Sequence, residues 1–420
     1  MKPNELPRLL RSGPQRALTQ REFEELYPRT KTLSPLDELK ASGLTGRGGA
    51  AFETFRKVDL IRQQHGHRKV MVVNCMEGEP ASHKDKTLAS LNPHLILDGA
   101  RALATMIGAH RVIVCVERDS KRTINAFTAA LGELNDSHIT FELQTPPGRY
   151  VAGEESALIH WLNSFESLPQ YRAKRPYIPH IGRHVAMVDN AETCANVSII
   201  SRFGAGWFRS LGTPQSPGSQ LVSVTGAVER PVVLEVSLGT TLRDILSAAH
   251  ADLDPQAILL GGYGGTFIKP EHLDVAYDHA SLSAIGATLG PGIIVVIPKS
   301  ACGLAETQRI VKWMANESAR QCGPCAFGLP ALSQDLHELT YSTRSSATTL
   351  LRLKERSGII NGRGACKHPD GVIRLIASAL EVFSNDVAAH SKGRTCGNER
   401  RAEHYATVPR LENEKDLVWE

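Results

Sequence analysis

A glycine-rich stretch from Gly43 to Lys57, GLTGRGGAAFETFRK, is the first segment whose residue types suit ligand binding. Four of its first seven residues are glycines, and Arg47 and Lys57 add positive charge. Glycine has no side chain to bury, so such a run cannot build a core, but it lets backbone N–H groups come close to an anion. We therefore expect the loop to bind a phosphorylated cofactor. The alternative is a flexible surface loop, since short glycine motifs also occur without a ligand.

Two acidic segments come next, NCMEGEP at 74–80 and YVAGEE at 150–155. Each follows a predicted strand, and ligands of parallel sheets bind at the carboxyl ends of the strands. Carboxylates at such a place accept hydrogen bonds from ribose hydroxyls or from a carboxamide. Capping is the alternative for Glu154 and Glu155, because they begin a predicted helix whose macrodipole favours negative charge.

Three cysteines of the C-terminal third have types and spacing that suit metal binding. Cys322 and Cys325 form a CxxC motif at the end of a predicted helix, and Cys366 follows farther along. Three thiolates in a reducing compartment suit an iron–sulfur cluster or zinc. A redox-active dithiol is the competing interpretation.

The other five cysteines are expected to be mainly structural. Cys75, Cys115 and Cys194 have no partner at ligand spacing, and a small buried hydrophobic residue is the default for them. Cys302 and Cys396 remain candidates for additional metal ligands.

The composition describes an ordinary globular protein of two to four domains: 420 residues, 41% hydrophobic and 22% charged. A net charge of +4 without a basic stripe argues against nucleic acid as a partner. The N-terminus, MKPNELPRLL, lacks the apolar core of a signal peptide, and the apolar run 292–298 is too short for direct membrane insertion. These features predict a cytoplasmic protein with reduced cysteines.

The elements that must position the ligand-binding residues alternate between strand and helix. Strands are expected at Lys69–Asn74, Arg111–Val116 and His138–Leu143, and helices near Pro93–Ala109, Ser120–Leu134 and Ser156–Ser164. This alternation predicts a parallel sheet with right-handed crossovers. Farther on, Asp189 and Asn190 are typical of a turn.

The second half of the chain changes character. The runs LVSVTGAV and PVVLEV, a helix near 241–249 and the run AILLGGYGG predict a compact β-grasp-like module. The segment 303–383 has helical periodicity and few β-branched runs, which predicts a small helical bundle. The charged last thirty residues are expected to be an extended tail or docking arm.

Five segments, in order, resemble motifs of the NADH-binding FMN flavoprotein subunit family of respiratory complex I. This family includes the flavin subunits of NAD-linked hydrogenases and formate dehydrogenases. The segments are GLTGRGGAAFETFRK, NCMEGEPASHKDK, YVAGEESAL, RAKRPYIP and VDNAETCANV. They are similar to GLRGRGGAGFPTGxKW, NADEGEPGTxKDR, YICGEETAL, RxKPPFP and VNNVETLANV, and the correspondence runs from about residue 40 to about residue 385.

The resemblance implies two bound nucleotides and a cluster. FMN would be held by Gly46, Arg47, Gly48, Lys57, Asn74, Gly153, Asp189, Asn190 and Thr193. NADH would lie against the flavin through Phe52, Glu77, Glu154, Glu155 and Lys174, with Glu77 and Glu155 assigned to the catalytic site. An iron–sulfur cluster of the [4Fe–4S] type would be bound by Cys322, Cys325 and Cys366. Hydride would pass directly from nicotinamide to flavin, so no general base is required.

Together with the predicted elements, the resemblance divides the chain into five parts of an α/β protein. They are an N-terminal arm (1–35), a Rossmann-like FMN/NADH domain (36–215), a β-grasp-like module (216–298), a helical iron–sulfur-type domain (299–390) and a C-terminal tail (391–420).

Several substitutions separate the chain from the family pattern, among them Glu53 and Phe55, which replace a proline and a glycine. Ala319 stands where the motif ESCGxCxxC has its first cysteine, Met76 replaces an aspartate, and Ala51 replaces a glycine. With three cysteines left, a four-iron cluster would need Cys302, Cys396 or a non-thiolate ligand, or would lose one iron. Absence of a cluster is the other alternative.

The expected function is that of an NADH-oxidising flavoprotein. It would pass single electrons to an iron–sulfur centre or to a ferredoxin-like or small [2Fe–2S] partner, and association with a membrane complex through partners stays open. The alternative is a non-catalytic scaffold subunit whose cofactor sites have degenerated, which Ala319 and Met76 motivate. A preference for NADPH is a third possibility, disfavoured because Glu154 and Glu155 would repel a ribose phosphate.

Overall fold

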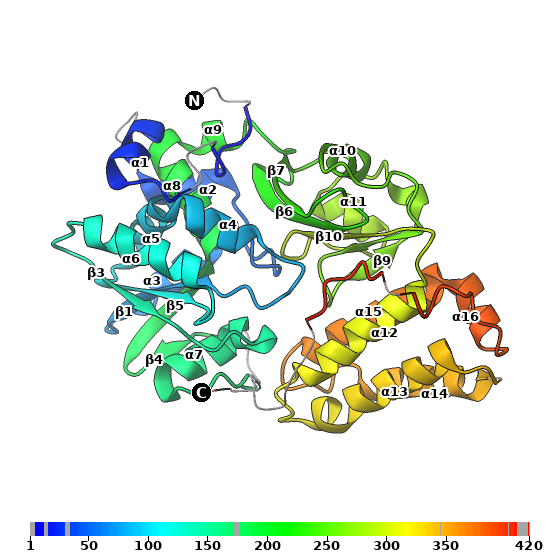
Figure 1. Cartoon of the computed structure of the whole chain (residues 1–420). Coiled ribbons are helices and arrows are strands. Elements are labelled where there is room, and N and C mark those ends of the chain that lie inside the picture. The colour runs from blue at the N-terminus through cyan, green and yellow to red at the C-terminus, as the bar shows by residue number, and fades with distance from the viewer. Residues whose placement is uncertain are drawn as a thin grey trace.

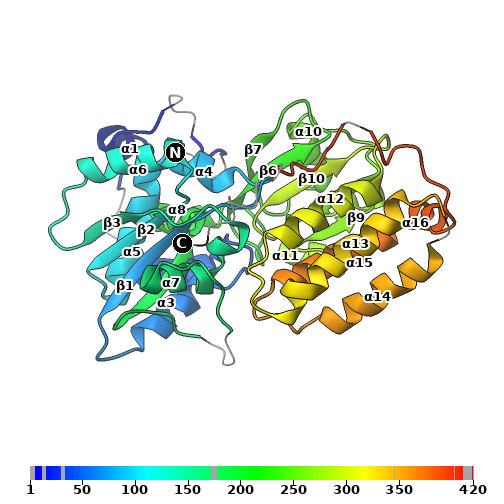
Figure 2. The ribbon, with the colours of Figure 1, turned by 60° about the horizontal axis from the view of Figure 1, so that its bottom comes forward.

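The computed structural model describes residues 5–11, 16–29, 34–171, 177–344, 346–401, 403–409 and 419. Two five-stranded sheets, the helices that pack on them and a group of C-terminal helices form the architecture of this part of the chain. In Figures 1 and 2 the first sheet and its helices form one side of the molecule, and the second sheet and the C-terminal helices form the other. The predicted α/β class is confirmed.

The first sheet has the strand order β3-β2-β1-β5-β4. Its strands are β1 (Lys69–Cys75), β2 (Arg111–Val116), β3 (Thr140–Gln144), β4 (His180–Ile181) and β5 (His184–Asn190). All neighbouring strands are parallel except β4, which pairs antiparallel with β5. The apolar runs that predicted β1 and β2 are buried because helices cover both faces.

The two faces of β1 pack into different cores. Met71 and Val73 lie in the core that contains α5 (Pro93–Ile107), α6 (Lys121–Glu133) and α8 (Ala191–Phe203). Val70 and Val72 face α7 (Glu155–Ser164) instead. The helices predicted from the sequence at α5, α6 and α7 are therefore present within one or two residues of their expected bounds.

The N-terminal segment is packed rather than detached where the structure describes it. Its helix α1 (Gln20–Leu26) begins at Thr19 with a capping box closed by Glu22. Phe23 is 1% exposed and Tyr27 is fully buried in the core of the first sheet. The expected arm is thus part of this layer.

The second sheet has the order β7-β6-β10-β8-β9. Its strands are β6 (Ser219–Gly226), β7 (Val232–Ser237), β8 (Ala257–Leu260), β9 (Thr266–Ile268) and β10 (Ile293–Ile297). Only β6 and β10 pair in parallel; the other pairs are antiparallel. One face of the sheet packs on α10 (Leu242–Ala248) and α11 (His279–Ala284), and the other on the C-terminal helices.

The C-terminal helices lie along this second sheet (Figure 2). They are α12 (Gly303–Asn316), α13 (Leu329–Tyr341), α14 (Ala347–Ile360), α15 (His368–Val382) and α16 (Ser384–His390), with a π-helical turn, η3 (Pro324–Gly328), before α13. The described part of the tail is also anchored, since the Ala406 N–H donates to Glu306 at 2.9 Å.

The remaining helices are short. They are α2 (Pro35–Ser42), α3 (Thr54–Arg62), α4 (Lys84–Leu91), η1 (Tyr150–Gly153), α9 (Ala205–Phe208) and η2 (Pro270–His272). Within the described ranges, none of the helices combines the length and the apolar character that a bilayer crossing requires.

Candidate functional site

The predicted ligand-binding residues converge on the carboxyl edge of the first sheet. Asn74, near the end of β1, pairs in register with Asn190, the last residue of β5. Asn190 is also the N-cap of α8, where its side chain accepts from the Glu192 N–H at 2.9 Å and donates to Asp85 at 2.7 Å. The turn expected at Asp189–Asn190 is therefore wrong, because these residues form a strand-to-helix junction.

The glycine loop between α2 and α3 lies against this junction. A Cβ atom on Gly48 would come within 3.3 Å of the Asn190 Cβ, and one on Gly46 would stand 4.0 Å from an Asp189 carboxylate oxygen. The loop closes on itself through a 2.8 Å hydrogen bond from the Gly46 N–H to the Phe52 carbonyl. A side chain at position 48 would therefore crowd the junction, whereas the space around Gly46 would accept a Cβ atom.

Asp189 has an acceptor that the described residues leave unused. Its side chain is 5% exposed, Oδ1 lies 3.7 Å from the Lys57 ammonium, and Oδ2 has no hydrogen-bond partner among the described residues. Burial raises the pKa of this carboxyl, opposed by Lys57 and assisted by the negative charge of Glu155. Buried polar atoms without partners are rare, so this oxygen suits a ligand that brings a hydroxyl or N–H donor. This free acceptor therefore fits a ligand with hydroxyl donors, such as the polyhydroxyl chain of FMN.

Asn74 connects the sheet edge to η1. Its side-chain amide donates to the Gly153 carbonyl at 2.9 Å and accepts from the Met76 N–H at 3.2 Å. A Cβ on Gly153 would lie 3.2 Å from the Met76 Cβ, so the two backbones approach closely here. Met76 is 8% exposed and packs in the core beneath α7, which gives this departure from the family pattern a packing role.

Arg47 differs from its expected role as a charge beside an anion. The residue is 2% exposed, and its guanidinium donates to the Thr45 hydroxyl at 3.0 Å and to the Pro217 carbonyl at 3.3 Å. Its backbone N–H donates to the Thr193 hydroxyl at 2.9 Å. These contacts hold the loop against α8 and against the residues before β6. The Arg47 side chain therefore positions the loop and is itself buried beneath it.

Two further residues of the glycine-rich stretch, Phe52 in the loop and Lys57 in α3, remain available to a ligand. Phe52 is 49% exposed, which leaves an aromatic face for stacking. The Lys57 ammonium donates to the Val188 carbonyl at 2.7 Å, which holds its charge at the end of β5. Lys174, predicted to contact NADH, lies outside the described residues.

The carboxylates of the two predicted acidic segments are largely engaged by other groups of the protein. The buried Glu77 carboxylate accepts from the Ser82 hydroxyl at 2.5 Å and from the N–H groups of Asp85 and Lys86 at 3.1 and 2.9 Å. Burial, with the nearby Asp85, raises the pKa of Glu77 to about 7. These contacts make Glu77 a positioning residue for its loop.

Glu154 caps α7, as the alternative interpretation expected. Its carboxylate accepts from the N–H groups of Ser156 and Ala157 at 2.8 and 3.2 Å. Glu155 stands in the first turn of α7, close enough for its charge to act on Asp189. Capping and ligand contact are compatible here, because both occur at the N-terminus of a helix.

Glu79, in the first acidic segment, makes a long-range contact that the sequence does not predict. It is 9% exposed and accepts the Tyr263 N–H at 2.7 Å, which links the flavin-side loop to the second sheet. Burial is the main cause that raises its pKa, to about 8, and the charge of Glu77 adds to it. Glu79 and Tyr263 are 184 positions apart in the chain, so no local sequence pattern predicts their contact.

This raised pKa predicts a pH-dependent stability. The protonated Glu79 favours folding, so its contribution is fully present below the ordinary carboxyl pKa and is lost as the pH rises through about 8. Glu79→Gln keeps the acceptor without the charge. Its melting temperature should therefore fall less than that of the parent between pH 6 and pH 9, when followed by circular dichroism.

The exposed Glu355→Gln on α14 is the control for that experiment. It should reproduce the pH profile of the parent. The melting temperature of Glu79→Gln will still fall somewhat with pH, because burial also raises the pKa of Glu77. Identical profiles for Glu79→Gln and the parent would contradict the assignment.

Two departures from the family motifs fall at left-handed backbone positions. Ala51, where the family has glycine, has φ +51°, and Arg320, at the glycine of ESCGxCxxC, has φ +52°. A side chain costs about 1–2 kcal/mol in this conformation. Both residues therefore occupy a conformation that glycine adopts without strain and that costs energy for a side chain.

Relief of that strain is measurable. Ala51→Gly should raise the free energy of unfolding by about 0.5–1 kcal/mol, because the relieved strain exceeds the entropy that glycine loses on folding. Urea unfolding gives the value. The same exchange at Ala129, exposed within α6, should lower it by about 1 kcal/mol. A loss of stability in both variants would show that residue 51 is not strained.

The three predicted cluster cysteines lie together in the helical region. Cys322 and Cys325 stand at the turn η3, and Cys366 precedes α15. Burial raises the pKa of the Cys325 thiol, and the neighbouring Cys322 and Cys366 raise it further. The three sulfur atoms do not all lie within 4.8 Å of one another, so they would bind different irons of an iron–sulfur cluster rather than share one ion.

The other cysteines do not complete this set. Cys302 is the N-cap of α12, whereas Cys322 lies beyond its other end, and a helix of 14 residues is about 21 Å long. Cys396 lies close to Cys302. Neither can therefore replace the missing thiolate at Ala319, so a fourth ligand would have to be a non-thiolate group.

One segment joins the flavin side to the cluster side. Arg149, just before η1, forms a buried ion pair with Glu317 at 2.9 Å, and the Tyr150 N–H donates to the same carboxylate at 3.0 Å. The Tyr150 ring packs on Trp313, with ring centroids 5.4 Å apart. Burial raises the pKa of Cys366 to about 11, and the negative charge of Glu154 contributes in the same direction. The segment 149–154 therefore contacts both sites.

Comparison with known proteins assigns two parts of the chain to family models. Residues 39–199 match the Nuo51 FMN-binding domain. Residues 305–390 match the NADH-ubiquinone oxidoreductase-F iron–sulfur binding region. These ranges contain the sheet-edge site and the three cysteines respectively.

Whole-chain relatives agree with these models. An NADH-quinone oxidoreductase subunit of Streptomyces coelicolor is 31% identical over 373 residues, which cover 85% of this chain and 83% of the relative. The NADP-reducing hydrogenase subunit HndC of Solidesulfovibrio fructosivorans is 27% identical over 384 residues, which cover 87% of this chain and 78% of HndC. A solved NAD⁺-reducing [NiFe]-hydrogenase superposes with a TM-score of 0.77 at 27% identity, although this chain spans only 64% of that one. The chain belongs to the family of NADH-quinone oxidoreductase subunits that carry the Nuo51 FMN-binding domain.

Proposed function

We propose that this chain is the NADH-oxidising FMN subunit of a larger redox assembly and passes single electrons to an iron–sulfur centre. The observation that supports this most directly is the segment 149–154. Asn74 at the flavin-side edge donates to its Gly153 carbonyl, while its Arg149 pairs with Glu317 and its Tyr150 ring lies 5.5 Å from that of His368, two residues after Cys366. A segment shared by both sites keeps them at a fixed separation, which electron transfer between them requires.

The chain's residues have binding and positioning roles in this proposal. Asp189 and Asn74 orient the polar part of the flavin, and Lys57 holds positive charge near it. The exposed Phe52 ring stacks on the nucleotide, while Glu155 offers an acceptor at the start of α7. The bound flavin supplies the conversion from two-electron to one-electron chemistry, so no side chain has to act as a general base.

The domain boundaries and the partners belong to the same proposal. The flavin unit would comprise residues 36–215, the β-grasp-like unit 216–298 and the cluster unit 299–390. The electron acceptor would be a ferredoxin-like or small [2Fe–2S] protein in the assembly. The names of the relatives, a quinone oxidoreductase and a hydrogenase, support a subunit role without choosing between these acceptors.

The test is an anaerobic visible absorption spectrum of the full chain before and after addition of NADH. We expect flavin bands that bleach, together with broad iron–sulfur absorption. Cys366→Ser is the matched variant, which should lose iron and the broad absorption while its flavin still bleaches. Reduction of a dye acceptor by NADH would then establish diaphorase activity of the isolated subunit, and NADPH serves as the specificity control.

A flavin that stays oxidised under NADH would overturn the proposal. A chain that takes up no FMN even in excess would instead support a scaffold subunit, for which Ala319 is the favouring observation. Bleaching without iron–sulfur absorption would restrict the proposal to a flavoprotein that reduces its partner directly.

A further inference from the structure

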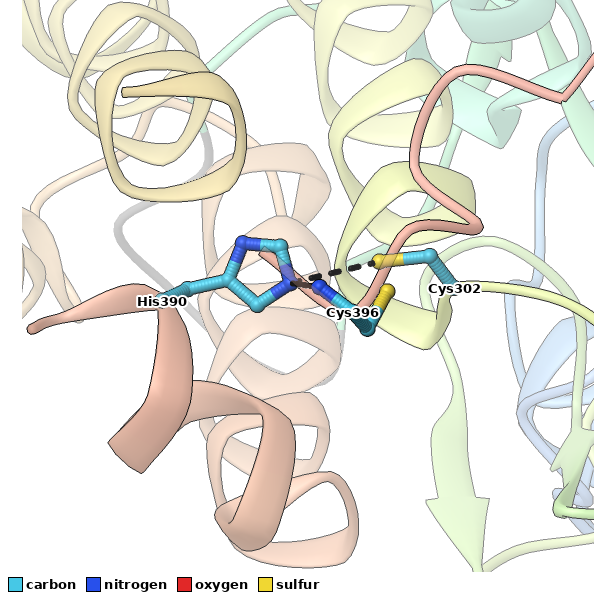
Figure 3. Close-up of side chains that lie close together, drawn as sticks. All are labelled: Cys302, His390 and Cys396. Atoms are coloured by element: carbon cyan, nitrogen blue, oxygen red, sulfur yellow. Dashed lines mark hydrogen bonds between the residues drawn. The ribbon is translucent and has the colours of Figure 1, made fainter. Parts of the chain in front are cut away.

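A second cluster of metal-binding side chains lies at the opposite end of α12 from the iron–sulfur cysteines. It consists of Cys302, His390 and Cys396, whose ligand atoms all lie within 4.8 Å of one another (Figure 3). His390 is fully buried and Cys302 is 2% exposed. The residues come from the start of α12, the end of α16 and the loop that follows.

The imidazole is oriented as a metal ligand requires. Its Nδ1 lies 2.8 Å from the Thr340 carbonyl, which can only accept, so Nδ1 carries the proton. The Nε2 lone pair then faces the cluster, 3.9 Å from the Cys302 sulfur, and the Cys396 N–H donates toward it at 3.3 Å. A carbonyl that fixes the tautomer in this way is the usual second partner of a metal-bound histidine.

The spacing of these atoms is close to that of a tetrahedral site. With metal–sulfur and metal–nitrogen bonds of about 2.3 and 2.0 Å, the sulfur–nitrogen edge of a tetrahedron is about 3.6 Å. The observed 3.9 Å between Cys302 and His390 requires only a small movement. Glu399, which is 9% exposed, has a carboxylate oxygen 3.7 Å from the Cys396 sulfur but lies outside the group of atoms within 4.8 Å of one another, so its loop has to move inward for it to complete four ligands.

We propose that Cys302, His390, Cys396 and Glu399 bind a structural zinc ion. Two thiolates, an imidazole and a carboxylate in a closed tetrahedral set favour zinc over the hard cations, which prefer oxygen ligands. The ion joins the loop after α16 to the start of α12. That loop leads to Ala406 and Thr407, which bond to Glu306 and Tyr263, so the zinc fixes the path of the C-terminal segment over the helical layer.

Metal analysis of the full chain tests this proposal. Purified protein, loaded with zinc and freed of excess ion, should retain about one zinc that Cys396→Ser and His390→Gln lose at least tenfold more readily to a chelator. Glu399→Gln should weaken binding without abolishing it. His404→Ala, a histidine of the same segment outside the cluster, is the matched control and should behave as the parent.

Vacant iron–sulfur cysteines could also take up zinc, and Cys366→Ser separates the two sites. We expect this variant to lose iron and to keep its zinc. Equal zinc retention in the parent and in Cys396→Ser would overturn the proposal, as would a Cys302–Cys396 disulfide in the freshly purified protein.

Proteolysis gives a readout that does not depend on metal counting. The segment contains exposed trypsin sites at Lys392, Arg394, Arg400 and Arg401. Chelation should increase cleavage at these sites severalfold in the parent, and Cys396→Ser should be cleaved rapidly without a chelator. Cleavage that is insensitive to the chelator in the zinc-loaded parent would also contradict the proposal.

Discussion

Gly99→Ala is expected to lower the free energy of unfolding by more than about 4 kcal/mol, among the largest effects of a single methyl group. Gly99 lies in α5 where it crosses α8. A Cβ atom there would stand 1.7 Å from the Cys194 carbonyl oxygen and 3.1 Å from the Ser198 nitrogen. Both are backbone atoms, so no side chain can turn aside, and the two helices would have to separate.

The same change should also weaken flavin binding. The N-terminus of α8 carries the Asn190 cap and the Thr193 hydroxyl that accepts from the glycine loop. A shift of α8 therefore displaces the loop from the sheet edge. FMN affinity, followed by quenching of flavin fluorescence, should fall at least tenfold in the fraction of Gly99→Ala that remains folded.

Gly358→Ala is the matched control for both measurements. Gly358 lies within α14, and a Cβ on it meets nothing within 4 Å. The substitution should raise the free energy of unfolding by up to about 1 kcal/mol, because alanine favours the helix. Urea unfolding of the two variants gives the comparison, and equal stability would contradict the close approach of α5 and α8.

The strands of the first sheet were predicted well because the apolar pattern that indicates each strand lies within that strand. Strands β1 and β2 are runs of valine and isoleucine buried on both faces, so each run marks its own strand. Strand β3 is half buried and carries Glu142 and Gln144, so its bounds were shifted by one or two residues. The apolar run that forms β10 was not predicted as a strand, because the sequence alone shows only that it is too short to span a membrane.

The sites were predicted in part, and the missed parts depend on contacts between distant segments. Motifs located Asp189 and Asn190, but the strand-to-helix junction follows from pairing with β1. The burial of Arg47 depends on Pro217, which lies 170 positions away. From the sequence, Cys302 and Cys396 are candidates for additional ligands of the same cluster. The structure separates them from Cys322, because α12 lies between Cys302 at its start and Cys322 beyond its end.

The coupling between the flavin side and the cluster side gives the second large effect. Arg149 and Glu317 are 6% and 8% exposed, and they are joined at 2.9 Å. Arg149→Met leaves the carboxylate buried without its partner, which typically costs about 3–5 kcal/mol. The loop from Glu317 to Cys325 should loosen as well, so reduction of the iron–sulfur centre by NADH should slow more than flavin bleaching does in stopped-flow absorption.

A double-mutant cycle separates the charge pair from simple loss of packing. Glu317→Gln should also destabilise the protein, but the double variant Arg149→Met/Glu317→Gln should cost clearly less than the sum of the two, because neither charge is then left alone. The exposed pair of Arg243 and Asp274, at 2.6 Å, is the matched control, and Arg243→Met should leave unfolding unchanged within error since water screens that pair. If the losses of unfolding free energy in the two single variants were additive in the double variant, burial rather than the ion pair would stabilise the segment 149–154. The slowed electron transfer would then have to be attributed to a general loss of packing around η1.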